Sequence, residues 1–288
     1  MKNSYSNIFP FNKKILIKSI INLKKGHVLG LPTETVYGLA GNAYSKKSVE
    51  KIFKLKRRPK INPLIVHYLD FQSAEKEVFF NDDFFKLYKK FCPGPITFIL
   101  KKKTNSKIQP SVTANLDTVA IRFPSHKIIR SILKIINFPL AMPSANISSN
   151  VSPVTSQHVF EEFKNNLNII IDGGNSKIGI ESTVVDLTNK PKILRPGVID
   201  AKLISKVLNK KTNIEIKNLK IKSPGMLKKH YSPGIPMYLN KRYKLSDHAF
   251  ITFGKNFYNN KNSFNLSKKA NLKEAASNLY KVLRKIKK

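Results

Sequence analysis

Residues 30–41, GLPTETVYGLAG, enclose two threonines and a glutamate between Gly and Pro positions, and IFKLKRRPKINPLIVHY at 52–68 adds a basic cluster and an apolar run. HVLGL at 27–31 predicts a strand that ends at Pro32, and a helix is expected to begin at 33–35. Free N–H groups and threonine hydroxyls at a helix start favour an anion. A capped turn beside a basic surface explains the same residues. From this stretch alone, both interpretations stay open.

Outward from this stretch, helical and strand patterns alternate, with hairpin-like pairs between them. Apolar residues recur at helical spacing in three early segments, at 13–24, 45–57 and 82–91. Short apolar runs predict strands at PLIVHY, ITFIL, TVAIRFP and NIIIDGG, and ESTVVDL is expected to form a hairpin with KILRPG. A further helix is predicted at 200–209. Such an order predicts a mixed α/β fold, in which helices flank a mixed sheet.

The regular pattern weakens after residue 209, which predicts three parts. Residues 13–209 form the main domain, and residues 210–236, with repeated Pro and Gly, form a linker. Residues 237–288 contain strand-like MYL and AFITFG and then helix-like NLKEAASNLYKVLRKI. A core of roughly fifty residues is marginal, so this last part is expected to be a reduced C-terminal α/β domain.

The formal net charge of +36 favours polyanionic partners such as nucleotides, tRNA or an anionic membrane. Lysine-, asparagine- and isoleucine-rich composition from AT-rich coding explains the charge equally well. No apolar run reaches the ~20 residues of a transmembrane helix, and the N-terminal ILIKSIINL lacks a signal-peptide cleavage site. The single Cys92 cannot form an intramolecular disulfide and fits a reducing cytoplasm.

Several common chemistries lack their motifs. The chain has no GxxxxGK[ST] or GxGxxG phosphate loop and no GxSxG nucleophile elbow. Cys92 precedes Pro-Gly-Pro without a base beside it in the sequence, which disfavours covalent catalysis. The histidines and the cysteine show no metal-ligand spacing, so no metal site of the protein itself is predicted.

What remains is a dispersed set of polar residues at the ends of predicted elements. Arg122 is the sharpest signal, because an arginine in a half-buried strand needs an anionic partner. The others have ordinary structural explanations as a solvated helix end, a hydrogen-bonded histidine or a turn; they are Lys56, Arg58, His67, Ser144, Asn146, Glu181, Ser182, Thr183 and Arg195. Each is weak alone, but their order and spacing together are informative.

Taken together, the blocks resemble the YrdC-like family of L-threonylcarbamoyladenylate synthases in its longer form with a C-terminal extension. The similarity covers roughly residues 13–236 and runs through PTETVYGL, LKRRPKINPLIVH, PGPITFIL, VAIRFP, PSANISS, IDGG, ESTVVDL, LRPG and HYSPG. The resemblance implies a YrdC-like twisted mixed sheet. It also implies that ATP, L-threonine and bicarbonate are converted to threonylcarbamoyl-AMP and pyrophosphate, for modification of the tRNA adenosine beside the anticodon by downstream transfer proteins.

The resemblance also implies roles for individual residues. Those expected to bind threonine are Thr35, His67, Arg122 and Ser182. Those expected to bind ATP are Lys56, Arg58, Asn62, Thr118, Ser144, Asn146, Ser152, Arg195 and Tyr231. The catalytic motif residues among them are Lys56, Arg58, Ser144 and Asn146. Mg²⁺ is expected to be carried by the nucleotide, and the linker that ends in HYSPG is expected to lie across the site.

Two other functions are weighed against this one. A non-catalytic RNA-binding protein would use the same basic cleft, and direct tRNA contact is compatible with the synthase as well. A carbamoyl-adenylate-forming module of hydrogenase maturation is disfavoured, because zinc-finger and acylphosphatase-like segments are missing. The sequence therefore predicts a cytoplasmic nucleotidyltransferase.

Overall fold

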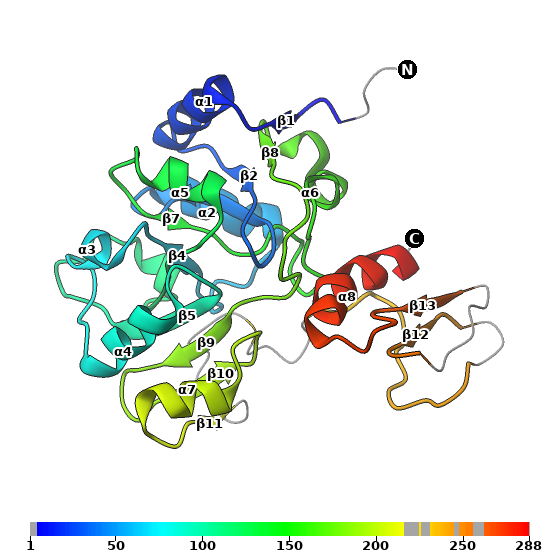
Figure 1. Ribbon diagram of the computed structural model, residues 1–288. Coiled ribbons are helices and arrows are strands. Elements are labelled where there is room, and N and C mark those ends of the chain that lie inside the picture. The colour runs from blue at the N-terminus through cyan, green and yellow to red at the C-terminus, as the bar shows by residue number, and fades with distance from the viewer. Residues whose placement is uncertain (1–4, 216–224, 226–230, 245–247, 256–261, 288) are drawn as a thin grey trace.

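The computed structural model describes residues 5–215, 225, 231–244, 248–255 and 262–287. Its centre is an eleven-stranded sheet in the order β1-β8-β2-β3-β7-β4-β6-β5-β9-β10-β11, with both parallel and antiparallel neighbours (Figure 1). The mixed α/β fold predicted from the sequence is therefore confirmed.

The strands of this sheet are short. They are β1 (Ile8–Pro10), β2 (Leu29–Leu31), β3 (Gly38–Asn42), β4 (Ile65–His67), β5 (Ile96–Lys101), β6 (Thr118–Arg122), β7 (Leu140–Ala141), β8 (Ile170–Asp172), β9 (Thr183–Asp186), β10 (Lys192–Arg195) and β11 (Asn213–Ile214). A separate parallel pair is formed by β12 (Phe250–Thr252) and β13 (Ser263–Asn265).

Eight α-helices are described around these strands, joined by short 3₁₀ turns at Pro110–Thr113 and Lys164–Asn166. They are α1 (Lys13–Lys24), α2 (Lys46–Lys56), α3 (Phe71–Ala74), α4 (Asp82–Phe91), α5 (Lys127–Leu133), α6 (Ser156–Phe163), α7 (Ala201–Leu208) and α8 (Leu272–Lys287). No helix among the described residues is long and apolar enough to cross a membrane.

Two hydrophobic cores lie on opposite faces of the sheet. Successive strand residues point to opposite faces, so Ile170 joins one core while Ile169 and Ile171 join the other. The core that contains Ile170 includes residues of α2 and α4, and the other includes residues of α1 and α5. Burial of both faces explains why the central strands read as continuous apolar runs.

The prediction that a helix begins at 33–35 is wrong. Residues 32–37 form a loop, and β3 returns antiparallel to β2, with Leu29 opposite Ala40. Thr33 Oγ1 accepts from the backbone N–H groups of Thr35 and Val36, at 3.2 Å each, and donates to Val36 O at 2.6 Å. Such local side-chain bonds give the backbone an alternative to helix.

The C-terminal part is only partly as predicted. AFITFG contains β12 and the last helical pattern forms α8, but residues 237–239, predicted as a strand, form none and are exposed. Strand β11 lies in the segment predicted as linker and pairs parallel with β10. Residues 216–224 and 226–230 of that linker lie outside the described residues, and the division into three parts stays a prediction.

The aromatic core beneath α4 yields a stability prediction. Phe84 is fully buried against the rings of Phe80, Phe98 and Phe123, whereas its neighbour Phe85 is 44% exposed. We expect Phe84→Ala to lower the free energy of unfolding by about 3–5 kcal/mol, because it leaves a cavity. Phe85→Ala is the matched control, with an expected loss of about 1 kcal/mol. Urea unfolding monitored by circular dichroism measures both, and equal losses would contradict this description of the core.

A candidate site for two anions

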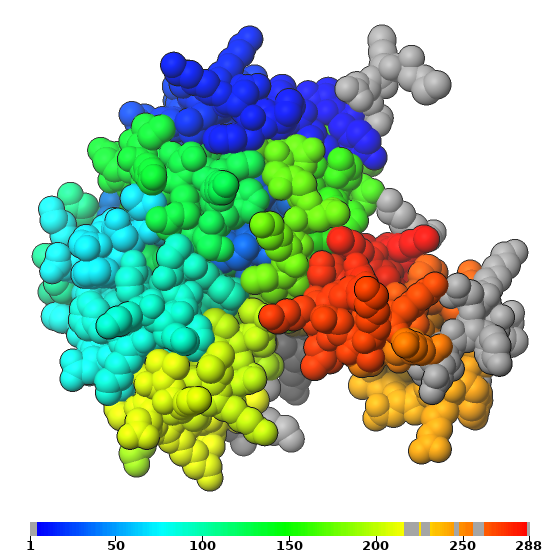
Figure 2. All heavy atoms as spheres, in the orientation of Figure 1, coloured from blue at the N-terminus to red at the C-terminus, as the bar shows by residue number. Residues whose placement is uncertain are grey.

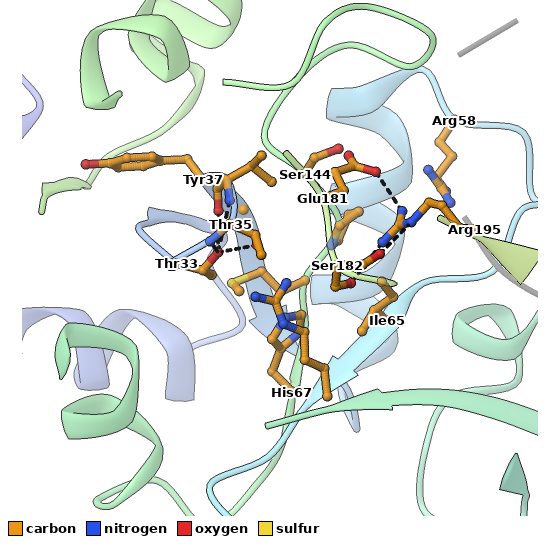
Figure 3. Close-up of a pocket in the computed structure, with 15 residues that line it drawn as sticks. Thr33, Thr35, Tyr37, Arg58, Ile65, His67, Ser144, Glu181, Ser182 and Arg195 are labelled. Carbon is orange, nitrogen blue, oxygen red and sulfur yellow. Dashed lines mark hydrogen bonds and ion pairs between the residues drawn. The ribbon is translucent and has the colours of Figure 1, made fainter. Parts of the chain in front are cut away.

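A pocket lies where the loop after β2 meets the ends of β4, β6 and β10. Figure 3 shows that its polar side chains converge from segments far apart in the chain. Seven of the residues predicted from the sequence line it, namely Thr35, Arg58, His67, Arg122, Ser144, Ser182 and Arg195. The structure thus brings residues expected to bind threonine and residues expected to bind ATP into one cavity.

Arg122 and His67 are neighbours because β4 and β6 run parallel with these two residues in register. Both side chains are buried, at 4% and 1% exposure. Among the described residues, neither ring nitrogen of His67 has a hydrogen-bond partner, and the same is true of Arg122 Nε. Buried polar groups are normally paired, so these two side chains, which line the pocket, have unused hydrogen-bonding capacity.

The anionic partner that a buried Arg122 requires is Glu34. Its Oε1 lies 2.6 Å from Arg122 Nη2, and its Oε2 accepts from the backbone N–H of Ser125 at 3.2 Å. Sequence reasoning missed the role of Glu34, although the residue stands between Thr33 and Thr35 in the opening motif. The signal that was available is charge balance, because a buried arginine implies a buried acid in the same chain or its ligand.

A second buried arginine is built in the same way. Arg195 Nη1 lies 2.6 Å from Glu181 Oε2, while its Nε and Nη2 donate to the carbonyl and hydroxyl oxygens of Ser182, at 3.0 Å each (Figure 3). Glu181 also accepts from Ser152 Oγ at 2.7 Å and from the hydroxyl of Tyr231. Three residues predicted to bind ATP therefore meet on one carboxylate.

The end of α2 turns two cations inward. Arg57 adopts the left-handed conformation at the helix C-cap and is exposed, whereas Lys56 and Arg58 on either side are buried. Lys56 Nζ donates to the carbonyl oxygens of Ser144 and Asn146, at 2.6 Å each. The motif at 56–58 is therefore no solvated helix end, and its lysine fastens the segment that contains Ser144 and Asn146.

Arg58 is fixed by its own loop. Its Nη2 donates to Asn62 Oδ1 at 2.6 Å and to Pro63 O at 2.7 Å, and its Nε donates to Asn62 O at 2.9 Å. Asn62 thus holds Arg58 in place.

Six predicted residues are outside the pocket lining, namely Lys56, Asn62, Thr118, Asn146, Ser152 and Tyr231. All except Thr118 contact residues already described, either directly or through Glu181. Thr118 lies at the opposite end of β6 from Arg122, about 13 Å away along the strand. Its buried hydroxyl has no hydrogen-bond partner among the described residues.

Burial and neighbouring charges change the ionisation of these groups. Burial, followed by the charge of Arg58, lowers the pKa of Lys56 to about 7, although Glu181 and Glu162 oppose the shift. Burial and the charge of Arg122 hold the pKa of His67 well below its ordinary value, so the imidazole is neutral at pH 7. Burial, the largest single influence, lowers the pKa of Arg195, but Glu181, Tyr231 and Tyr280 together outweigh it and the net shift is upward.

The fold and this site define a mixed α/β protein with an arginine-lined pocket. Two family models match the chain. The Sua5/YciO/YrdC model, described as "Telomere recombination", covers residues 22–197, and the model described as "Threonylcarbamoyl-AMP synthase, C-terminal domain" covers residues 199–288. The chain therefore belongs to the Sua5/YciO/YrdC family, in the form that carries the additional C-terminal domain.

Individual relatives agree with this assignment. The chain is 41% identical over 220 residues to the threonylcarbamoyl-AMP synthase of Pyrococcus abyssi, covering 73% of this chain, and 40% identical over 220 residues to that of Bacillus subtilis, covering 75%. It spans 63% of the length of each of these relatives. The crystal structure of P. abyssi Sua5 complexed with L-threonine superimposes with a TM-score of 0.85 at 32% identity, over 96% of this chain and 88% of that one.

The lowered pKa of Lys56 predicts a pH dependence of stability. Its folded-state pKa is about 7 against 10.5 for an unperturbed lysine, so between these values the unfolded state binds more protons and stability rises with pH. We expect Lys56→Met to remove up to about 1.4 kcal/mol per pH unit of this rise. Urea unfolding at pH 7, 8 and 9 measures the slope. Lys54→Met, at an exposed position of the same helix, is the control and should keep the wild-type slope. An unchanged slope in Lys56→Met would show that the lysine stays protonated.

Proposed function

We propose that this chain is a nucleotidyltransferase, an L-threonylcarbamoyladenylate synthase that forms threonylcarbamoyl-AMP and pyrophosphate from ATP, L-threonine and bicarbonate. The observation that carries the proposal is the placement of two buried arginines, Arg122 and Arg195, in one pocket. The neutral His67 at the end of β4 lines the same pocket. The names of the relatives from P. abyssi and B. subtilis support the same activity, and the solved P. abyssi protein was crystallised with L-threonine.

The Arg122 side of the pocket suits an amino acid. Glu34 is ion-paired with Nη2 of Arg122, and the buried Nε stays available to donate to an incoming carboxylate. A planar guanidinium binds a carboxylate by two parallel hydrogen bonds, which a lysine cannot reproduce. The Thr35 and Ser182 hydroxyls and the neutral His67 line the same cavity and offer further hydrogen bonds. In this proposal they bind the amine and hydroxyl of threonine.

The Arg195 side suits phosphates. The carboxylate of Glu181 engages Arg195, Ser152 and Tyr231. An ATP phosphate offers the same partners a second anion, with Arg58 and Lys56 available to balance its charge. We propose that Asn62, Ser144 and Asn146 serve the nucleotide by holding these cations, and that Thr118 takes part from its place on β6.

The reaction needs no protein nucleophile. The neutral amine of threonine attacks the carbon of bicarbonate, a C–N bond forms, and water leaves to give a carbamate. A carbamate oxygen then attacks the α-phosphorus of ATP, and pyrophosphate leaves with the electron pair of the broken P–O bond. Catalysis therefore consists of holding the anions together and stabilising the charge that develops on the transferring phosphate, which is what preorganised cations do.

Mg²⁺ belongs to the proposal as a companion of ATP. Glu181, the carboxylate that engages the ATP-binding residues, is hydrogen-bonded to Ser152 and Tyr231 and ion-paired with Arg195. Mg²⁺ prefers phosphate oxygens and water and needs few protein ligands, so this donor set fits an ion that enters with the nucleotide. When bound, it would neutralise charge on the phosphates.

The wider setting also stays a proposal. The labile product would pass to transfer proteins that modify tRNA beside the anticodon, and the reaction would take place in the cytoplasm. The net charge of +36 supports direct tRNA contact but does not require it, because basic composition alone explains the charge.

One assay tests the proposed function directly. Purified protein should release pyrophosphate from ATP only when both L-threonine and bicarbonate are present, and the nucleotide product should carry the threonylcarbamoyl group by mass spectrometry. L-Serine, which lacks the threonine methyl group, is the matched substrate control. Pyrophosphate release without threonine dependence, or none at all, would contradict the synthase and leave RNA binding as the alternative.

Replacing Arg122 should damage one half of the site selectively. We expect Arg122→Ala to raise the threonine KM by at least about tenfold, because a charge-assisted pair contributes roughly 1.5–3 kcal/mol. Arg122→Lys should recover only part of this loss, and Arg242→Ala, at an exposed arginine, should leave the KM unchanged. Steady-state pyrophosphate release against threonine concentration measures the effect. A folded Arg122→Ala protein with wild-type threonine KM would show that Arg122 does not bind the substrate carboxylate.

A further inference from the structure

The last helix, α8, packs against the segments that build the site. Figure 2 shows this helix in red, lying against green segments of the main unit, by which we mean the eleven-stranded sheet with helices α1–α7. Its Tyr280 and Leu283 are buried in a cluster with Val36, Val151 and Val154. The approach is also close at the backbone, since a Cβ added at Gly179 would lie 2.5 Å from Ser277 Cα.

A buried ion pair connects α8 to the main unit. Arg284 Nη2 lies 2.9 Å from Glu162 Oε1 on α6, and the two side chains are only 10% and 8% exposed. Arg284 also donates from Nη1 to Val151 O at 2.7 Å and from Nη2 to His158 O at 3.2 Å. Removing one member of such a pair leaves an uncompensated buried charge, so the contact is costly to lose.

The pair extends to the segment 144–152, which contains Ser144, Asn146 and Ser152. Glu162 Oε2 accepts from the backbone N–H of Ile147 at 3.0 Å and from Asn150 Nδ2 at 3.4 Å. The amide of Asn146 in turn donates to the carbonyl oxygens of Ile147 and Asn150, at 2.8 and 2.9 Å. The segment 144–152 is therefore linked to Arg284 through Glu162, and the carbonyl oxygens of its Ser144 and Asn146 accept from Lys56.

A second contact reaches the nucleotide side independently. The ring of Tyr280 stacks on Tyr231, with centroids 5.5 Å apart and planes inclined by 28°. Tyr231 donates its hydroxyl hydrogen to Glu181, the partner of Arg195. By contrast, Glu34 binds Arg122 on β6 and the backbone N–H of Ser125, and neither partner is a residue of α8.

We propose that Arg284 and Tyr280 are positioning residues, through which α8 holds the segment 144–152 and Tyr231 in the arrangement that binds the nucleotide. This inference rests on the proposed function. It assigns the C-terminal helix a role in ATP affinity. At the threonine end, α8 packs on the apolar Val36, while the ion pair between Arg122 and Glu34 is built from β6 and the loop after β2.

Substrate affinities of full-length variants test the proposal. We expect Arg284→Met to raise the ATP KM about tenfold or more, with the threonine KM changed by less than about twofold. Arg284→Lys keeps the charge but lacks the several N–H donors of the guanidinium, so its ATP KM should lie between those of Arg284→Met and the wild type. Tyr280→Leu should also raise the ATP KM. Lys273→Met removes a charge from an exposed position of α8 and is the matched control. Equal changes for both substrates, or none, would overturn the proposal.

A readout without turnover separates this inference from the proposed function. Amide hydrogen exchange at 146–152 should be faster in Arg284→Met than in Lys273→Met, while exchange in β5 stays the same. If Arg284→Met does not fold, Glu162→Gln keeps the side-chain shape and tests the same ion pair. If the wild type shows no threonine-dependent pyrophosphate release, the proposed function fails. Hydrogen exchange then decides the positioning role, and unchanged exchange at 146–152 overturns it.

Discussion

The site depends on the pairing of buried arginines with buried glutamates. Arg122 and Arg195 carry charge inside a sheet whose two faces are both covered, and a lone cation there would be prohibitively costly. Glu34 and Glu181 offset that cost, because a carboxylate oxygen of each lies 2.6 Å from a guanidinium nitrogen of its arginine. Each glutamate also orients its arginine, and both arginines line one pocket.

Lys56 links helix α2 to the segment 144–152. It ends α2, donates to two carbonyls of the segment 144–152, and faces Arg58 across the turn at Arg57. Burial lowers its pKa to about 7, and the carboxylates of Glu181 and Glu162 partly restore it. One residue therefore couples the helix that presents the cations to the segment that presents Ser144 and Asn146.

Much of the architecture follows from local sequence. Helices α1, α2, α4 and α7 begin and end within one residue of the ends that their sequence patterns predict. In the structure, Asn12, Ser45, Asn81 and Asp200 each accept a backbone N–H at a helix start. The loop at 32–37 was missed, since the Thr33 hydroxyl accepts from the backbone N–H groups of Thr35 and Val36 and β3 is a buried strand. The strand expected at 237–239 failed because its apolar side chains are exposed and gain no core to pack on.

By itself the sequence determined the mixed α/β class, the family resemblance and seven of the fifteen residues that line the pocket, because periodicity and ordered motifs are local properties. The tertiary structure alone decided which charges meet. Glu34 lies 88 residues from Arg122, and Glu162 lies far from Arg284 in the chain, so no local pattern pairs them. Strand register and helix packing bring these groups within hydrogen-bonding distance, where low polarity makes each pairing strong and each unpaired charge costly.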